Sequence, residues 1–298
     1  MSILREVIQQ SHRYLESLDI PDARLEAEVV VMNVLRMPRQ EIFAQQEREI
    51  TSQQEKDISA ILDRRRQREP LAYIFGYKEF YGINLAVTPD VLIPRPETES
   101  MVEHALFMAL MGMETPQLVI ADVGTGTGAI AINLAIHLPA AHVYAIDNSE
   151  PALRVAAYNV QSHNVADRIT LCYGDLLDAL DEEDGQSESP TMLDLIVANL
   201  PYIPSQRIST LQPEVQKEPR AALDGGEDGM EVIRRLFSQA GKHLKDTGVI
   251  LLELDPDQVP AAQELAERYF PEAETAVEKD LAQMDRFFIV NRGPAEES

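Results

Sequence analysis

The 298-residue sequence contains a single cysteine, Cys172, which excludes a framework of intrachain disulfides. The run around it, RITLCYGD, has the pattern of a strand, and this predicts that the thiol is part of the core. A zinc cluster would need several thiols, and the six histidines show no paired spacing such as HExxH. We therefore expect no metal centre.

Long apolar runs are also missing, because none approaches the roughly 20 residues that span a bilayer. The N-terminus, MSILREVIQQSHRY, is charged and amphipathic, without the apolar block and cleavage site of a signal peptide. These features predict a soluble cytoplasmic protein with no membrane partner. The apolar content of 45% is that of an ordinary globular chain, long enough for one large domain and a small one.

Basic residues are scarce: 26 lysines and arginines face 50 acidic residues, for a net charge of −24. The first 80 residues carry 12 basic and 14 acidic side chains, and the remainder carries 14 and 36. A surface this acidic repels phosphate backbones, which disfavours a nucleic-acid substrate. General solubility or a salt-adapted host would produce the same excess.

Helical spacing of apolar residues runs through residues 1–69 and predicts a small helical domain. Its last helix ends in Arg64-Arg65-Arg66, and the basic run from Arg64 to Arg68 is either a solvated helix end or a partner-binding patch. From Pro70 the pattern changes to aromatic residues and turn glycines, which predict a β-hairpin linker over residues 70–99.

Strand and helix patterns alternate in residues 100–298, the third predicted domain, after a short helix at 101–110. We predict strands at 117–123, 142–147, 168–174, 193–199 and 248–254, and helices at 127–138, 149–162, 226–245 and 257–269. A final pair, 273–279 and 286–292, is expected to form an antiparallel hairpin at the sheet edge, and the acidic run 178–191 a flexible surface loop. This order predicts an α/β fold with a mostly parallel sheet covered on both faces.

A glycine-rich turn follows the first predicted strand, in ADVGTGTGAIAINLA. Gly124, Gly126 and Gly128 allow a sharp turn and a close approach to a ligand at the start of the following helix. The same stretch satisfies the dinucleotide pattern GxGxxA, so an NAD-dependent enzyme stays open at this point.

Two aspartates stand at the ends of the next two predicted strands: Asp147 is the last residue of its strand, and Asp175 directly follows the other. Asp147 could accept both ribose hydroxyls of a nucleoside held over the glycine turn, or could cap a helix. Asp175 could accept from an adenine amino group, or could be a turn residue. Neither residue separates NAD from S-adenosylmethionine.

The fourth predicted strand ends at Asn199-Leu200-Pro201-Tyr202. The Asn199 side-chain oxygen and the Leu200 carbonyl can both accept from one NH2 group, and Pro201 fixes the backbone that aims that carbonyl. Tyr202 can stack on the planar group that carries the NH2. Such a clamp suits methyl transfer to a flat nitrogen, whereas hydride transfer has no need of it.

The chain resembles the class I S-adenosylmethionine-dependent methyltransferases, and among them the release-factor glutamine N5-methyltransferases of the PrmC/HemK family. The resemblance covers nearly all of the sequence and is carried by the stretches REPLAYIFGYKEFYG, VTPDVLIPRPETE, ADVGTGTGAIAINLA, ANLPYIP, EPRAALDGGEDGMEVIRRL and GVILLEL. It implies a Rossmann-like seven-stranded methyltransferase domain, a hairpin linker and an N-terminal helical domain that docks the substrate. It further implies methylation of the glutamine in the GGQ motif of class 1 peptide chain release factors.

The resemblance also assigns roles to residues. Cofactor binding falls on Gly124, Thr125, Gly126, Thr127, Gly128, Asp147, Asp175, Leu176 and Asn199, and the catalytic clamp on Asn199, Leu200, Pro201 and Tyr202. Two positions depart from the family pattern. Leu200 stands where a proline is usual, and ELDPDQ (253–258) lacks an expected glycine.

Asn-Leu-Pro-Tyr also occurs in rRNA adenine dimethyltransferases. An adenine N6-methyltransferase acting on rRNA or DNA is therefore the alternative, although it would need a basic docking surface. A non-catalytic binding module on the same fold is a third reading.

Overall fold

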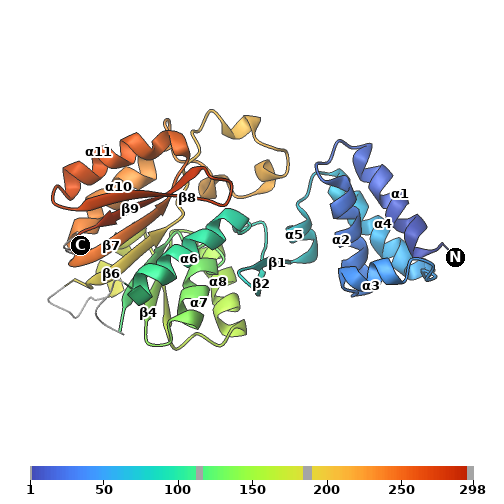
Figure 1. Ribbon diagram of the computed structural model, residues 1–298, viewed down its shortest axis with the longest axis horizontal. Coiled ribbons are helices and arrows are strands. Elements are labelled where there is room, and N and C mark those ends of the chain that lie inside the picture. Colours follow the sequence, from blue (N-terminus) through green and yellow to red (C-terminus); the bar gives the residue numbers. More distant parts are fainter. Residues whose placement is uncertain (1, 112–116, 184–189, 294–298) are drawn as a thin grey trace. The chain divides into compact units, whose positions relative to one another are not determined.

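The computed structural model of the chain describes residues 2–111, 117–183 and 190–293 (Figure 1). Contacts divide it into two compact units. The first comprises Met1–Gly76 together with Pro213–Lys217, and the second comprises Tyr77–Gln212 and Glu218–Ser298. A short segment from the later half of the chain is therefore part of the N-terminal unit.

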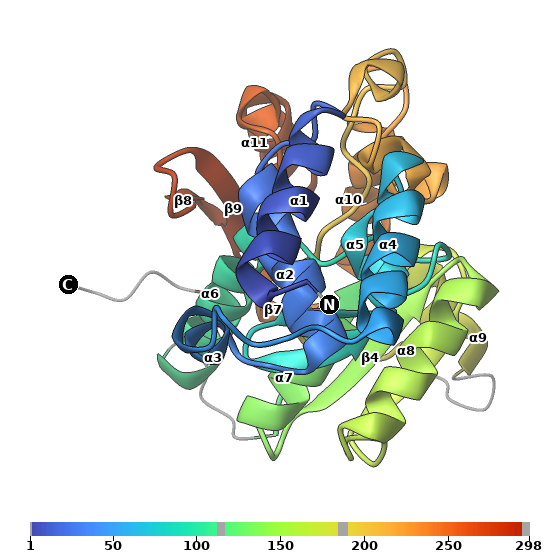
Figure 2. The same cartoon turned by 90° about the vertical axis from the view of Figure 1, so that its right-hand side faces the viewer.

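The first unit is helical, as the apolar spacing predicts. Its helices are α1 (Leu4–Glu16), α2 (Ala23–Leu35), α3 (Arg39–Ala44), α4 (Ser52–Arg66) and α5 (Leu71–Phe75), joined by the 3-10 helix η3 (Val215–Lys217). Helices α1, α2 and α4 lie side by side (Figures 1 and 2). Buried Leu4, Val30 and Ile58 from these three helices meet in one core. Helix α4 begins with a capping box between Thr51 and Gln54, which satisfies backbone groups at its start.

Arg65, in the last turn of α4, is a buried cation with only 2% of its side chain exposed. Its guanidinium donates to both carboxylate oxygens of Glu26 at 2.7 and 3.0 Å, and pairs with Glu214 Oε1 at 2.9 Å. Arg68 pairs with the same Glu214 oxygen at 3.2 Å. The two readings of this basic run, a solvated helix end or a partner patch, are thus both wrong for Arg65, which holds residues 213–217 in the unit.

We expect Arg65→Ala to destabilise the N-terminal unit by about 3–5 kcal/mol, because it leaves the partly buried Glu26 carboxylate without its cation and Glu214 with Arg68 alone. Urea denaturation followed by circular dichroism measures the change. Arg66→Ala is the matched control, since Arg66 is exposed in the same turn and its removal should change stability by no more than about 0.5 kcal/mol. Indistinguishable curves for the two variants would contradict the assigned role of Arg65.

The predicted hairpin exists but is shorter than residues 70–99. Strands β1 (Tyr77–Phe80) and β2 (Ile83–Ala86) pair antiparallel across a turn at Tyr81 and Gly82, whose φ values are both positive. The start of the run is instead helix α5, and its end is the start of helix α6 (Pro96–Met111). Proline favours the first turn of a helix, so α6 begins earlier than the predicted residue 101.

The second unit is built on a seven-stranded sheet in the order β5-β4-β3-β6-β7-β9-β8. The strands are β3 (Val119–Val123), β4 (His142–Asp147), β5 (Ile169–Tyr173), β6 (Leu193–Ala198), β7 (Leu244–Glu253), β8 (Glu274–Lys279) and β9 (Asp285–Asn291). The first five in this order run parallel, and β9 and β8 form an antiparallel edge. The sequence-based fold class, including the edge hairpin, is confirmed.

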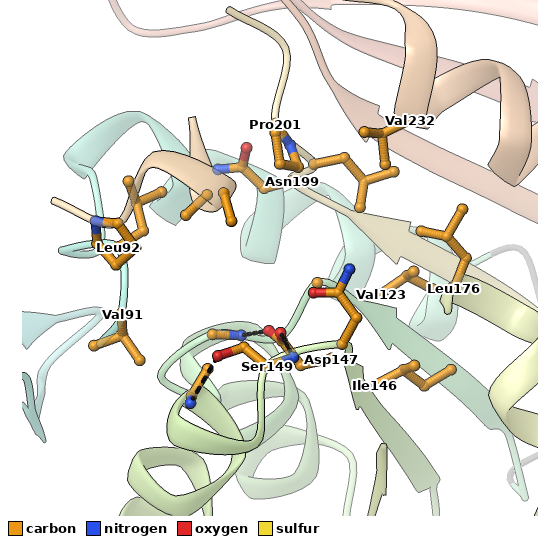
Figure 3. Close-up of a pocket in the computed structure, with 18 of the residues that line it drawn as sticks. Val91, Leu92, Val123, Ile146, Asp147, Ser149, Leu176, Asn199, Pro201 and Val232 are labelled. Atoms are coloured by element: carbon orange, nitrogen blue, oxygen red, sulfur yellow. Dashed lines mark hydrogen bonds between the residues drawn. The ribbon is translucent and has the colours of Figure 1, made fainter. Parts of the chain in front are cut away.

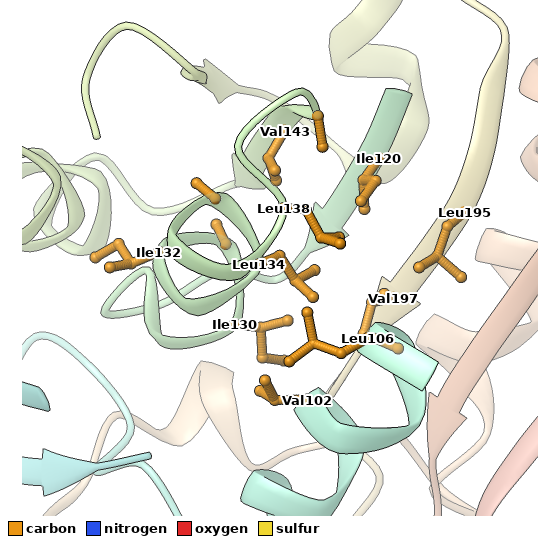
Figure 4. Close-up of a cluster of buried hydrophobic side chains, with 14 of the residues drawn as sticks. Val102, Leu106, Ile120, Ile130, Ile132, Leu134, Leu138, Val143, Leu195 and Val197 are labelled. Carbon is orange, nitrogen blue, oxygen red and sulfur yellow. The ribbon is translucent and has the colours of Figure 1, made fainter. Parts of the chain in front are cut away.

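Helices cover both faces of this sheet, and strand β6 shows why. Its Leu195 and Val197 join the core under α6 and α7 (Ala129–His137), which Figure 4 shows in close-up. The alternate residues Ile196 and Ala198 join the opposite core, under α10 (Glu231–His243) and α11 (Val259–Tyr269). Side chains two residues apart share a face, so a strand with apolar residues on both faces must be buried on both sides.

Helix α8 (Glu150–Ser162) matches its predicted range closely, and α10 begins later than the predicted residue 226. The expected acidic loop at 178–191 is partly wrong, since Asp178 ends the 3-10 helix η1 (Leu176–Asp178) and Ala179–Glu183 forms helix α9. Residues 184–189 of that run lie outside the described residues.

Candidate active site

The strand order reverses direction between β3 and β6, and a pocket lies at the carboxyl ends of these strands. It contains about 860 Å³ of space that no protein atom fills, part of it open to solvent. In Figure 3 Asn199 and Pro201 lie on one side and Asp147 and Ser149 on the other. Among the predicted site residues, the pocket brings together Gly124, Gly126, Asp147, Asp175, Leu176, Asn199, Leu200 and Pro201.

The glycine turn after β3 is shaped for close approach. Gly124 has φ +77°, and a Cβ there would lie 3.1 Å from Leu200 Cδ2. Leu200 is buried, so the residue that replaces the usual proline packs its side chain against the glycine turn. A side chain at position 124 would both strain the backbone and press on the clamp segment.

Two threonines of the turn have roles within it. The Thr125 hydroxyl donates to Asp122 Oδ2 at 2.7 Å, and the Thr127 carbonyl accepts from Asn159 Nδ2 at 2.9 Å. Asp122 is fully buried, and burial raises its pKa to about 6, with the charge of Asp147 adding to the shift. The predicted site residues Thr125, Thr127 and Gly128 are not among the described residues that line the pocket.

Asp147 ends β4 with its carboxylate held by backbone amides. Oδ2 accepts from the Gly126 N–H at 2.9 Å, and Oδ1 accepts from the Ser149 N–H at 2.9 Å. Burial raises the pKa of Asp147, and these hydrogen bonds oppose the rise. The cap of helix α8 is Ser149, whose hydroxyl accepts from the Ala152 N–H. The Asn148 backbone amide contributes a further hydrogen bond to the Asp147 carboxylate. A carboxylate has about four lone-pair sites, so Asp147 keeps some acceptor capacity for a ligand.

Asp175 and Leu176 follow β5 and line the pocket. The Asp175 carboxylate forms an ion pair with Arg235 of helix α10, a partner that the sequence analysis missed. Leu176 is buried with φ +55°, an uncommon conformation for a leucine. Arg235 also lines the pocket, so this ion pair is part of the pocket lining.

The Asn199–Tyr202 tetrad follows β6 directly. Three of its residues line the pocket, whereas Tyr202 is not among the described lining residues. The Tyr202 hydroxyl lies 3.5 Å from Glu253 Oε1, and burial followed by the charge of Glu253 raises the pKa of the phenol. Its predicted stacking on a substrate therefore stays a prediction.

Two glycines of the EPRAALDGGEDG stretch pack directly against the backbone of the tetrad, where a larger residue would not fit. A Cβ at Gly225 would lie 2.6 Å from the Pro201 carbonyl oxygen, and one at Gly229 would lie 2.3 Å from that of Tyr202. Gln258, at the end of ELDPDQ, donates to the Tyr202 carbonyl at 2.7 Å and to that of Gly229 at 3.2 Å. The segment that departs from the family pattern thus fixes the clamp backbone by a side-chain amide.

The PRPETE stretch supplies further polar contacts that sequence reasoning did not assign. Arg95 donates to Glu218 Oε1 at 2.6 Å. Thr98 accepts from Asn199 Nδ2 at 3.1 Å and donates to Glu253 Oε2 at 2.7 Å. The unusual sequences of the PRPETE and ELDPDQ runs could have marked them as functional. No local pattern, however, predicts which side chains they contact.

Comparison with known proteins identifies the family. Residues 6–76 match the PrmC N-terminal domain, and residues 114–280 match a methyltransferase domain. The release factor glutamine methyltransferase of Moorella thermoacetica is 38% identical over 289 residues, covering 97% of this chain and 98% of that protein. Its counterpart from Coxiella burnetii is 38% identical over 272 residues, covering 91% and 92%. The chain belongs to the release factor glutamine methyltransferase family.

Solved structures show the same fold at low identity. A methyltransferase from Pyrococcus furiosus has a TM-score of 0.51 at 18% identity, covering 78% of this chain and 100% of its own. The human Mettl16 catalytic domain, in complex with an RNA hairpin, has a TM-score of 0.56 at 17% identity and covers 74% and 77%. Another Mettl16 structure, with a TM-score of 0.50 at 18% identity, covers 71% and 76% and contains SAH. These likenesses concern the methyltransferase fold alone.

Proposed function

We propose that this protein transfers a methyl group from S-adenosylmethionine to the side-chain amide nitrogen of the glutamine in the GGQ motif of class 1 peptide chain release factors. The observation that carries the proposal is the sharing of one pocket by a nucleoside-type site and an NH2 clamp. Asp147 and the glycine turn form the first, and Asn199 with Leu200 forms the second.

The pocket residues fit S-adenosylmethionine. Gly124 leaves a space that a Cβ would fill, and the backbone amide of Gly126 is held in place by Asp147. The remaining lone pairs of Asp147 suit the two ribose hydroxyls. Leu176 and the Asp175 carboxylate line the end where the adenine would lie. When bound there, S-adenosylmethionine supplies an electrophilic methyl group on a sulfonium.

The clamp residues orient the substrate amide nitrogen, which is a poor nucleophile. An amide nitrogen reacts slowly because its lone pair is delocalised into the carbonyl. Two acceptors, Asn199 Oδ1 and the Leu200 carbonyl, can hold the two hydrogens of the substrate NH2 and fix the direction in which its nitrogen points. The same contacts polarise the N–H bonds, and the excess proton can leave after transfer. No strong base is required.

Charge and family both favour a protein substrate over a nucleic acid. The net charge of −24 disfavours binding to a phosphate backbone. The full-length similarity to release factor glutamine methyltransferases gives the adenine N6-methyltransferase alternative no support.

Among the described residues, no helix has the length and hydropathy to cross a bilayer. A role in translation termination places the proposed reaction in the cytoplasm.

A methyl-transfer assay tests the proposal. The purified protein is offered radiolabelled S-adenosylmethionine with a class 1 release factor and, in parallel, with rRNA. We expect label on the release factor and none when the GGQ glutamine is replaced by alanine. Label on the rRNA, or label on the release factor that survives this replacement, would overturn the proposed function.

A further inference from the structure

The clamp works only if the Asn199 amide presents its oxygen to the substrate. An asparagine amide has an acceptor end and a donor end of nearly the same shape. Turned the other way, it would direct its own NH2 at the substrate NH2 and hold nothing. The structure must therefore contain something that selects one of the two orientations.

The selecting contact is a chain of two hydrogen bonds. Asn199 Nδ2 donates to Thr98 Oγ1 at 3.1 Å, and Thr98 Oγ1 donates to Glu253 Oε2 at 2.7 Å. A hydroxyl has one hydrogen, and that of Thr98 is used by the carboxylate. Only lone pairs of Thr98 then face Asn199, so the donor end of the amide must lie on this side.

We propose that Thr98 and Glu253 are positioning residues for methyl transfer, and that they hold the Asn199 amide with its oxygen toward the substrate. The proposal rests on the proposed function for the identity of the substrate. The hydrogen-bond chain itself belongs to the free protein and can be observed without any substrate.

The charge of Glu253 controls the direction of these two hydrogen bonds. As a carboxylate, Glu253 can only accept, which forces the arrangement described above. When protonated, it can donate to Thr98, whose hydrogen is then free to bond the oxygen of Asn199, and the amide can turn over. The negative charge also polarises the two linked hydrogen bonds, so that Asn199 Oδ1 becomes a stronger acceptor.

Several groups surround Glu253, which is almost fully buried at the end of β7. Burial raises its pKa, and the charge of Glu97 in the first turn of α6 adds to the rise. The Thr98 hydrogen bond, the Arg286 charge from β9 and the Tyr202 hydroxyl oppose it. Arg95 and Asp255 also face Tyr202. The carboxyl thus titrates above its usual value of 4.5.

The first test uses valine at position 98, which keeps the shape of threonine and removes its hydroxyl. We expect Thr98→Val to lower kcat about 100-fold, as small misplacements at a reacting centre do, with unchanged affinity for S-adenosylmethionine. Thr98→Ser restores the hydroxyl and should recover most of the rate. Thr275→Val is the matched control, because the Thr275 hydroxyl also donates to a side-chain oxygen, that of Gln263, on edge strand β8. Wild-type kcat in Thr98→Val would overturn the proposal, as would a loss that serine fails to recover.

The second test needs no methyl transfer. The Asn199 side-chain amide signals, observed by nuclear magnetic resonance in the free protein, should shift as the pH is lowered and Glu253 protonates. Glu253→Gln should abolish this shift and also the acid limb of kcat measured at saturating donor. Signals that do not move in the wild type, or that move equally in Glu253→Gln, would overturn the proposal. If the signals titrate but no release factor is methylated, the proposed function fails while the positioning role stands.

Discussion

Asn199→Ala is expected to lower kcat for release-factor methylation by about 10²–10³-fold, the cost typical of removing one preorganised polar contact to a reacting group. The variant loses one of the two acceptors for the substrate NH2 and the orientation that this acceptor imposes. Affinity for S-adenosylmethionine should change far less, because the glycine turn and Asp147 remain in place. Single-turnover rates at saturating donor, together with calorimetric titration of the donor, separate the two effects.

Asn84→Ala is the matched control for this variant. Asn84 is an exposed asparagine on β2, in the same unit and outside the pocket, so its removal should leave both quantities at wild-type values. Equal losses of rate and donor affinity in Asn199→Ala would mean that Asn199 serves the cofactor site or the local fold. In that case the clamp would not be the source of catalysis.

Much of the second unit could be predicted from the sequence because its signals are local. Strand β6 is buried at every position and apolar at every position except Asp194, and only a strand buried on both faces has this pattern. The carboxyl ends of parallel strands converge on one edge, which is why Gly124, Asp147 and Asn199 could be placed together before any contact was known.

Local signals were insufficient where two patterns compete. The run from Leu71 to Phe75 contains β-formers, yet it forms helix α5, which ends at Gly76 in the left-handed conformation. Arg65 could not be recognised as buried, because its partner Glu214 lies far along the chain and an arginine is normally exposed. Each case depends on tertiary contacts that propensity does not contain.

The support of the clamp was equally hidden. Thr98 and Asn199 are 101 positions apart, and Thr98 and Glu253 are 155 apart. A threonine in the first turn of a helix ordinarily satisfies backbone groups there. Nothing in PRPETE alone indicates that its hydroxyl meets an asparagine and a glutamate from two different strand ends. The sequence therefore predicted the residues that would face the substrate and missed those that orient them.

Asp147→Ala is expected to weaken S-adenosylmethionine binding by about 10²–10⁴-fold, since hydrogen bonds to a charged group contribute about 1.5–3 kcal/mol each and two ribose hydroxyls lose their acceptor. The variant also frees the Gly126 and Ser149 amides that the carboxylate holds, which loosens the turn beneath the ligand. Calorimetric titration of the donor measures the loss. Glu150→Ala is the matched control, because it removes an exposed carboxylate three residues further on, which is not among the described residues lining the pocket.

The pH dependence of binding distinguishes the charge of Asp147 from its shape. Burial raises its pKa, so the carboxylate that the ribose needs is lost as the pH falls through a value above the usual 3.8. Donor affinity should therefore decline toward acid pH, and Asp147→Asn should remove this part of the decline. Any decline that remains in Asp147→Asn belongs to other groups of the site, such as Asp122, whose pKa burial raises to about 6. An Asn variant that retains wild-type affinity would refute the assignment of Asp147 to the ribose.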